Sequence, residues 1–172
     1  MKNLTNRIIE WVSRPLIIVE SIGVSIEDRI TLGIFAGITA NIVRNIVGFI
    51  SFFAGLQDYH IWQFAASAYV TTEEAQSVGM IVGLFSDYMI ASLLGVFAVY
   101  FLLYVGFNYY LLKGIFIGGL AWVFIFTIVV STGISKINPN STTGSISYLF
   151  NHLLLGVLIV IILKKYGKKV YD

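Results

Sequence analysis

The chain contains no cysteine, so disulfides, thiolate metal sites, iron–sulfur ligation and cysteine nucleophiles are all excluded. Only two histidines are present, His60 and His152, and no cluster of metal-ligand residues surrounds either of them in the sequence. The sequence also lacks a Gly-rich phosphate loop and a Ser/His/Asp constellation. We therefore expect neither an enzyme nor a protein that binds a metal or another cofactor.

Charged residues are scarce as well. They make up 12% of the 172 residues, whereas about 25% is usual for a soluble domain. Hydrophobic residues make up 58%, and the net charge of +2 is too small to indicate nucleic-acid binding. This composition predicts a protein embedded in membrane lipid, with no nucleic-acid partner.

Four segments hold the roughly 20 mainly apolar residues that a helix needs to cross a bilayer. They are residues 30–53, 78–105, 114–134 and 146–163. The predicted fold is an all-α polytopic membrane protein, a four-transmembrane-helix bundle over residues 30–166.

The connections between these spans carry further signals. Residues 57–77 are expected to hold a short helix, near 58–70, that is interfacial or partly re-entrant. Thr71 stands three residues before Glu74, a spacing that predicts a capping-box start for the second span. The short 106–113 connection predicts that the second and third spans are antiparallel neighbours.

The two ends of the chain are the most basic parts. Residues 1–29 are expected to form an amphipathic segment at the cytoplasmic interface, with a disordered arm as the alternative. Residues 167–172 form a basic tail. Of the 11 Lys and Arg residues, nine fall on the side of the two termini, one is Lys136, and the last lies within a span. By the positive-inside rule, both termini are cytoplasmic.

Arg44 and Asp87 are charged residues inside predicted spans, where charge is costly. Counted along the helices, each lies roughly 14 Å below the outer boundary, and His152 lies about 9 Å deep. We predict an Arg44–Asp87 ion pair that faces the bundle interior. Its remaining hydrogen bonds would involve His152 together with Asn41, Asn45 or Asn151.

Such a polar centre has more than one interpretation. A buried ion pair can serve only to fix helix packing. Histidine and carboxylate at one depth are also typical of a proton or ion pathway, and Arg44 could bind an anionic substrate. The leading hypothesis is a small proton- or ion-linked transport or sensing protein. The alternative is a non-catalytic structural or accessory membrane subunit.

Glycines form a second pattern. Gly33 and Gly37 on the first span, and Gly114 and Gly118 on the third, each have the GxxxG spacing that lets helix backbones approach closely. Packing within the chain is the favoured interpretation, and assembly into a homo-oligomer or a larger membrane complex is the alternative.

At these residues the chain resembles the YagU-like bacterial inner-membrane proteins, and also the YqhR-like proteins of Firmicutes. The resemblance covers residues 33–37 with Arg44, residues 113–121, and Phe150-Asn-His-Leu153 with the basic end that follows. Lysine stands in the family pattern where this chain has Arg44, and histidine where it has Asp87. The resemblance implies a four-helix protein of the bacterial inner membrane, and no biochemical activity comes with it.

Overall fold

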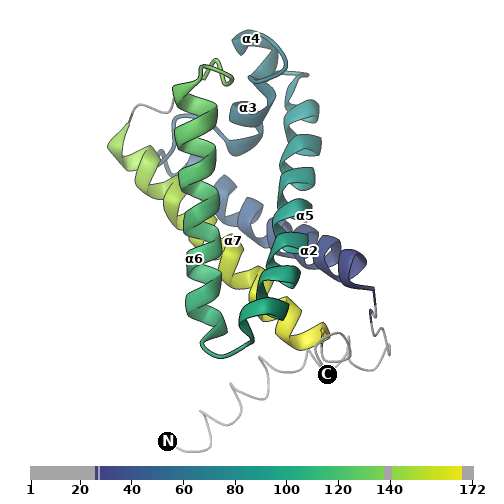
Figure 1. The fold of residues 1–172 in the computed structure, drawn as a ribbon. Helices are drawn as coiled ribbons and strands as arrows, with labels where there is room; N and C mark the ends of the chain where they lie inside the picture. The colour runs from purple at the N-terminus through teal and green to yellow at the C-terminus, as the bar shows by residue number, and fades with distance from the viewer. Residues whose placement is uncertain (1–25, 27, 138–140, 168–172) are drawn as a thin grey trace, which may run out of the picture.

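The computed structural model describes residues 26, 28–137 and 141–167, and within them it contains helices and no strand. Four long helices form the bundle that the sequence predicts (Figure 1). They are α2 (Arg29–Phe53), α5 (Met80–Val105), α6 (Tyr110–Phe124) with its continuation η1 (Ile125–Val130), and α7 (Thr142–Tyr166). The predicted N-terminal amphipathic segment and nearly all of the basic tail lie outside the described residues.

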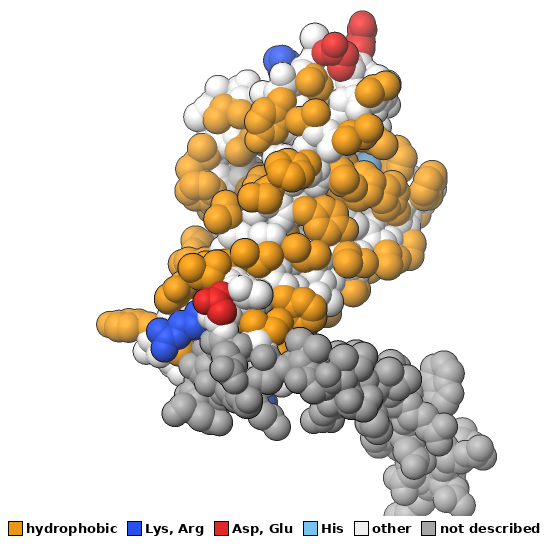
Figure 2. Space-filling model, turned by 90° about the vertical axis from the view of Figure 1, so that its right-hand side faces the viewer, with side chains coloured by type: hydrophobic (Ala, Val, Ile, Leu, Met, Phe, Trp, Pro, Cys, Tyr) orange, Lys and Arg blue, Asp and Glu red, His pale blue; other side chains and the backbone are white. Residues whose placement is uncertain are grey.

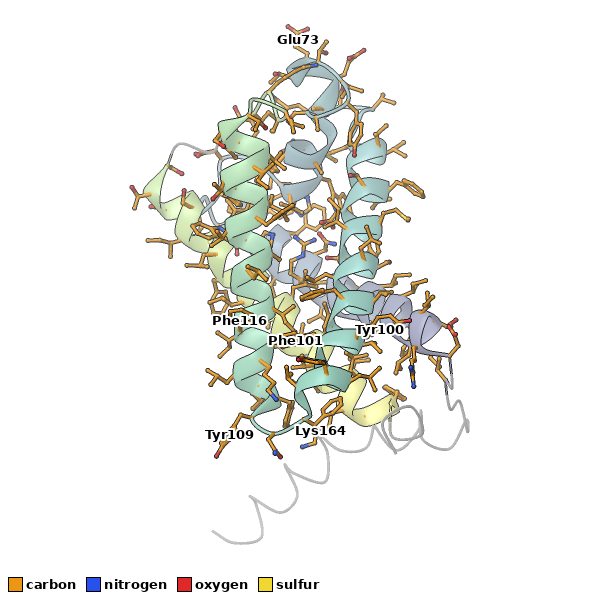
Figure 3. The ribbon with its side chains drawn as sticks, in the orientation of Figure 1. Glu73, Tyr100, Phe101, Tyr109, Phe116 and Lys164 are labelled. Atoms are coloured by element: carbon orange, nitrogen blue, oxygen red, sulfur yellow. The ribbon has the colours of Figure 1, made fainter. Side chains whose placement is uncertain are left out.

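All four helices are long and apolar enough to cross a membrane, α6 and η1 counting as one. Large hydrophobic side chains cover the middle of the surface, and acidic and basic side chains gather toward its two ends (Figure 2). Glu73 marks one end, whereas Tyr109 and Lys164 mark the other (Figure 3). Such a surface fits a multi-pass membrane protein, because lipid tails rather than water would surround the apolar belt.

Two short helices lie between the first two spans. α3 (Ile61–Ala66) packs on α5, where a Cβ added to Gly83 would lie 1.8 Å from the Trp62 carbonyl oxygen. The predicted capping box is present, with Thr71 and Glu74 bonded reciprocally. It begins α4 (Thr72–Ala75), however, and the prediction that it begins the second span is wrong. A turn separates α4 from α5, which begins at Met80 with no side-chain cap.

The third and fourth spans are displaced from their predicted bounds. The third begins at Tyr110, directly after a turn in which Gly106 and Tyr109 both have positive φ. Its last six residues form the π-helix η1, and it ends at Val130, short of the predicted position 134. The fourth begins earlier than predicted, at Thr142, because the Ser141 hydroxyl caps its first turn.

The four spans pack as two helix pairs, which we call the first hairpin (α2 and α5) and the second hairpin (α6 and α7). Glycines allow the closest contacts in the first hairpin. A Cβ added to Gly37 would lie 2.1 Å from the Ala91 carbonyl oxygen, and one added to Gly95 would lie 2.0 Å from that of Gly33. The two backbones therefore touch, and no larger side chain fits between them.

The second hairpin repeats these contacts at equivalent positions. A Cβ added to Gly118 would lie 2.2 Å from the His152 carbonyl oxygen, and one added to Gly156 would lie 2.2 Å from that of Gly114. Both GxxxG faces predicted from the sequence are thus occupied within the chain, and neither is left free for a second copy.

The sequences of the two hairpins correspond as well. Residues 33–40 read GIFAGITA and residues 114–121 read GIFIGGLA. Residues 93–102 read LLGVFAVYFL and residues 154–163 read LLGVLIVIIL. Because matching sequences make matching contacts, we interpret the bundle as two copies of one helix hairpin in tandem.

The two copies do not pack symmetrically. α2 packs against α7. The repeat relates α2 to α6 and α7 to α5, so a symmetric bundle would also have α6 packed along α5. These two helices are antiparallel, as predicted, but they are close mainly near their shared turn, where the rings of Phe101 and Phe116 lie 6.1 Å apart (Figures 1 and 3). Farther from the turn the two helices line a cavity, so the prediction that they are neighbours holds for close contact only near the turn.

Adjacent glycines on α6 test this packing. Gly118→Ala should lower the melting temperature in detergent, because the new methyl group would meet the α7 backbone. Gly119→Ala is the matched control, since its Cβ would lie 3.5 Å from the nearest atom, Leu153 Cδ2, and alanine favours a helix by about 1 kcal/mol over glycine. Equal melting temperatures for the two variants would contradict the close α6–α7 contact.

Candidate polar centre and cavity

An ion pair lies at the centre of the first hairpin. Arg44 on α2 donates from Nη2 to Oδ1 of Asp87 on α5, over 2.5 Å. Arg44 is 3% exposed and Asp87 is 8% exposed, so the pair is shielded inside the protein. The two charges cancel, which lowers the cost of holding a guanidinium at this depth.

Two asparagines complete the hydrogen bonds of the pair. Asn41 and Asn45 donate to Oδ2 of Asp87, over 2.8 Å and 3.1 Å. The side-chain amide oxygen of Asn41, Oδ1, accepts from Nε and Nη2 of Arg44. Asn41, Arg44 and Asn45 share a face of α2 because they are three and four positions apart along the helix. This face meets Asp87 on α5, and the group is called the polar centre below.

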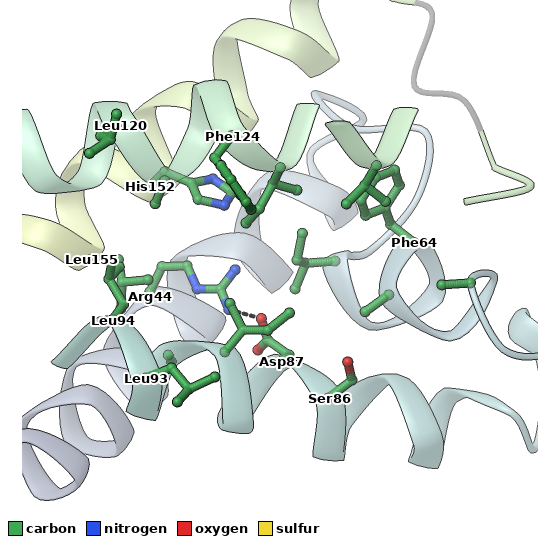
Figure 4. Close-up of a pocket in the computed structure, with 18 of the residues that line it drawn as sticks. Arg44, Phe64, Ser86, Asp87, Leu93, Leu94, Leu120, Phe124, His152 and Leu155 are labelled. Carbon is green, nitrogen blue, oxygen red and sulfur yellow. Dashed lines mark hydrogen bonds and ion pairs between the residues drawn. The ribbon is translucent and has the colours of Figure 1, made fainter. Parts of the chain in front are cut away.

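The sequence predicted two further members of this group, and the structure places them differently. The His152 ring lies beside Arg44, but its Nδ1 is 2.8 Å from the Tyr148 carbonyl oxygen, one turn back on α7 (Figure 4). The Asn151 side chain is buried, and its carbonyl oxygen has no partner among the described residues. Neither residue hydrogen-bonds to the ion pair, because α7 packs on the opposite side of Arg44 from α5.

A carbonyl oxygen only accepts, so the bond to Tyr148 fixes the tautomer of neutral His152. Nδ1 carries the hydrogen and Nε2 holds a lone pair. Nε2 bonds to no residue that the structure describes, and neither does Arg44 Nη1. Arg44 Nη1 is therefore a free donor group in the polar centre, and His152 Nε2 is a free acceptor beside it. Asn45 Oδ1 is also buried without a partner among the described residues.

Arg44, Asp87 and His152 line part of a cavity of about 560 Å³. The rest of its wall comes mainly from apolar side chains of α3, α5 and α6 with η1, among them Phe64, Leu94 and Leu120 (Figure 4). A volume of this size is typical of small-molecule sites, which combine apolar walls with a few polar groups. Ile125 and Val129 of η1 contribute to the wall, and π-helical segments are frequent at functional sites.

The tandem repeat shows how the polar centre is specialised. The positions of Asn41 and Asn45 correspond to Trp122 and Phe126 in the second hairpin, whose rings stack at 5.3 Å. The position of Asp87 corresponds to Tyr148, whose ring lies 5.5 Å from that of Phe126. One hairpin thus holds hydrogen-bonded polar groups where the other holds aromatic rings in contact with one another.

His60 was not predicted to belong to this region. It is 2% exposed, caps α3 through its Nδ1, and stacks on Phe49 with ring centroids 3.8 Å apart. Burial lowers the pKa of His60 to about 4, with a further contribution from the positive charge of Arg44, and His60 is therefore neutral near pH 7. The sequence offered no clear signal for this role, since histidine is not a usual N-cap residue and its ring here takes the place of the usual capping oxygen.

No family model, curated protein or solved structure matches this chain. The resemblance to the YagU-like proteins therefore stays a prediction. Within the described residues, no group of three or more potential ligand side chains could hold a metal ion.

The depressed pKa of His60 predicts acid sensitivity. In the unfolded chain, histidine binds a proton near pH 6.5, whereas folded His60 resists it down to about pH 4. The free energy of unfolding contributed by this residue is therefore fully present above pH 6.5 and is lost as the pH falls toward 4. His60→Asn keeps a capping side chain and removes the titration.

We expect denaturant unfolding in detergent to show a smaller loss of stability between pH 7 and pH 5 for His60→Asn than for the wild type. The comparison must be made on the loss with pH, since the variant also forfeits the Phe49 stacking contact at every pH. Parallel stability profiles for the two proteins would contradict the assignment.

Proposed function

We propose that this is a small membrane transport or sensing protein, linked to protons, in which His152 acts beside the Arg44–Asp87 pair in the wall of the cavity. The observation that supports the proposal most is the free Nε2 of His152 within a cavity that also reaches the ion pair. Ionisable groups buried at membrane depth commonly mark a pathway for protons or substrate.

The arrangement favours a proton over another ion. Asp87 already accepts three hydrogen bonds, from Arg44, Asn41 and Asn45. A metal cation would thus find few free oxygen ligands here, and the positive charge of Arg44 would repel it. His152 Nε2 needs no new ligand set to take up a proton, because one lone pair is sufficient.

Protonation of His152 would also change the balance of charge. The polar centre is neutral while Arg44 and Asp87 pair and His152 is uncharged. A proton on Nε2 would place a second cation beside Arg44, and a net positive charge in a low-dielectric interior is costly. Such a change could shift α7 relative to the first hairpin, which is the kind of two-state response that transport or sensing requires.

A structural role is the second candidate, and one observation favours it. The Asp87 carboxylate accepts hydrogen bonds from three donors within the protein, as expected of a pair that only sets helix packing. The free Nε2 of His152 and the cavity are not needed for that role, and for this reason we rank it second.

The location of the protein is part of the proposal. The excess of Lys and Arg near the two termini supports a cytoplasmic position for both. The resemblance to the YagU-like proteins supports the bacterial inner membrane.

Proteoliposomes that contain a pH-sensitive dye test the proposal. Under an imposed pH gradient, the wild type should dissipate the gradient faster than empty vesicles do. His152→Gln should bring the rate close to that of empty vesicles, since glutamine cannot take up a proton. His60→Gln is the matched control and should keep most of the flux, because His60 lies outside the cavity wall.

Absence of flux under pH and ion gradients, from protein that remains folded, would contradict the transport proposal and favour the structural role. Equal flux from the wild type and His152→Gln would show that protons do not pass through this histidine.

A further inference from the structure

We propose that the cavity binds an uncharged amphiphile, with an apolar body between α5 and α6 and a hydroxyl group held by Arg44 and His152. This deepens the proposed function by naming the class of molecule that the same site would take, and it rests on that function only for the use made of the bound molecule. Three features of the cavity support it: free hydrogen-bonding groups, apolar walls and an opening between the two helices.

Arg44 and His152 offer the cavity one free donor group and one free acceptor. Arg44 Nη1 donates to no described residue, and the free Nε2 of His152 accepts while the ring is neutral. Both residues are 3% exposed, so these are buried groups that face the cavity rather than bulk solvent. A hydroxyl group matches both, because its oxygen can accept from Arg44 while its hydrogen is donated to His152.

The charge of the ligand is limited by the ion pair. Arg44 is already neutralised by Asp87 at 2.5 Å. An anionic head group would leave the site with a net negative charge, and a cationic one would meet the guanidinium, so either would be costly in this interior. An uncharged head group that gains two hydrogen bonds avoids both costs.

The walls fit a long apolar body. On α5 the cavity is lined by Leu93 and Phe97, and on α6 by Leu120 and Phe124. All four of these side chains are also on the outer surface, with exposed fractions of 65% for Leu93, 45% for Phe97, 46% for Leu120 and 62% for Phe124. The cavity is therefore partly open at the apolar belt of the molecule, where lipid would surround it.

The tandem repeat makes this opening informative. α2 and α7 pack together along one side of the bundle, whereas α5 and α6, which are related to them by the repeat, separate above their turn. The gap between α5 and α6 therefore stands where the repeat would otherwise place a helix contact like that between α2 and α7. It gives a route by which a lipid-soluble molecule could enter sideways from the bilayer.

Photolabelling of the full chain in proteoliposomes tests the inference. The probe is hexadecan-1-ol with a diazirine in its chain, and the two matched probes are its methyl ether and the corresponding fatty acid at a pH where it is ionised. The alcohol should label peptides that contain the α5 and α6 wall residues. The methyl ether, which cannot donate to His152, should need about tenfold more probe for half-saturation.

Variants separate the contribution of the head group from that of the walls. With His152→Phe, the alcohol should need about tenfold more probe for half-saturation, the same change that is expected for the methyl ether on the wild type. His152→Gln offers an acceptor and should restore part of the labelling. Ala121→Trp should abolish labelling by filling the cavity from α6. Melting temperatures in detergent verify that each variant is folded.

The inference would be overturned by labelling spread evenly over the lipid-facing sides of all four spans, by equal labelling with the alcohol and its methyl ether, or by preferential labelling with the ionised acid. Proton flux without specific labelling would leave the proposed function standing and refute this ligand class. Specific labelling without proton flux would support the site and refute proton-linked transport.

Discussion

A guanidinium that is buried in a lipid-embedded helix must be neutralised, and the bond between Arg44 and Asp87 meets that requirement here. The cost of a charged side chain at the centre of a bilayer is at least about 2.5–3.5 kcal/mol on insertion scales and much larger in other treatments. The pair must therefore form across α2 and α5, and this fixes the rotation of both helices. Asn41 and Asn45 then both donate to Oδ2, the second oxygen of the carboxylate.

The glycine contacts make this pair geometrically possible. Gly37 and Gly95 bring the backbones of α2 and α5 into contact, so a short aspartate side chain can reach an arginine on the neighbouring helix. The second hairpin has the same backbone contacts but no charges at the corresponding positions, and it packs aromatic rings there instead. The shared scaffold thus sets the distance between the helices, and a few side chains decide whether their interface is polar or aromatic.

Much of this architecture was predictable from the sequence. The length and apolar character of four segments identify the spans, since a helix must hide its backbone from lipid over about 30 Å. The Arg44–Asp87 pair follows from equal depth and opposite charge. The hydrogen bonding of His152 was harder to predict, because depth alone does not give the direction in which a side chain leaves its helix. In the structure its Nδ1 bonds to the Tyr148 carbonyl oxygen instead of the ion pair. The gap between α5 and α6 was also missed, because a short connection indicates proximity at the turn and says little about the rest of the helices.

The internal repeat is a further signal in the sequence, one that the predictions above did not draw on. The two GIFxGxxA segments and the two LLGVxxVxxL segments reveal the tandem hairpin before any coordinates are known. Aligning them pairs Asn41, Asn45 and Asp87 with Trp122, Phe126 and Tyr148, which would have set the polar centre apart from the common scaffold. His60 gave no comparable signal, since a histidine cap depends on the local geometry at the start of α3.

The most direct test of the account is a double-mutant cycle on the ion pair, with denaturant unfolding in detergent as the measurement. Asp87→Asn and Arg44→Gln should each lower the free energy of unfolding by about 3–5 kcal/mol, because each leaves an uncompensated buried charge. The double variant leaves none, so its loss should be well below the sum of the two single losses, with a coupling energy of about 2 kcal/mol or more. Additive losses, with a coupling energy near zero, would show that these two side chains do not neutralise one another inside the bundle.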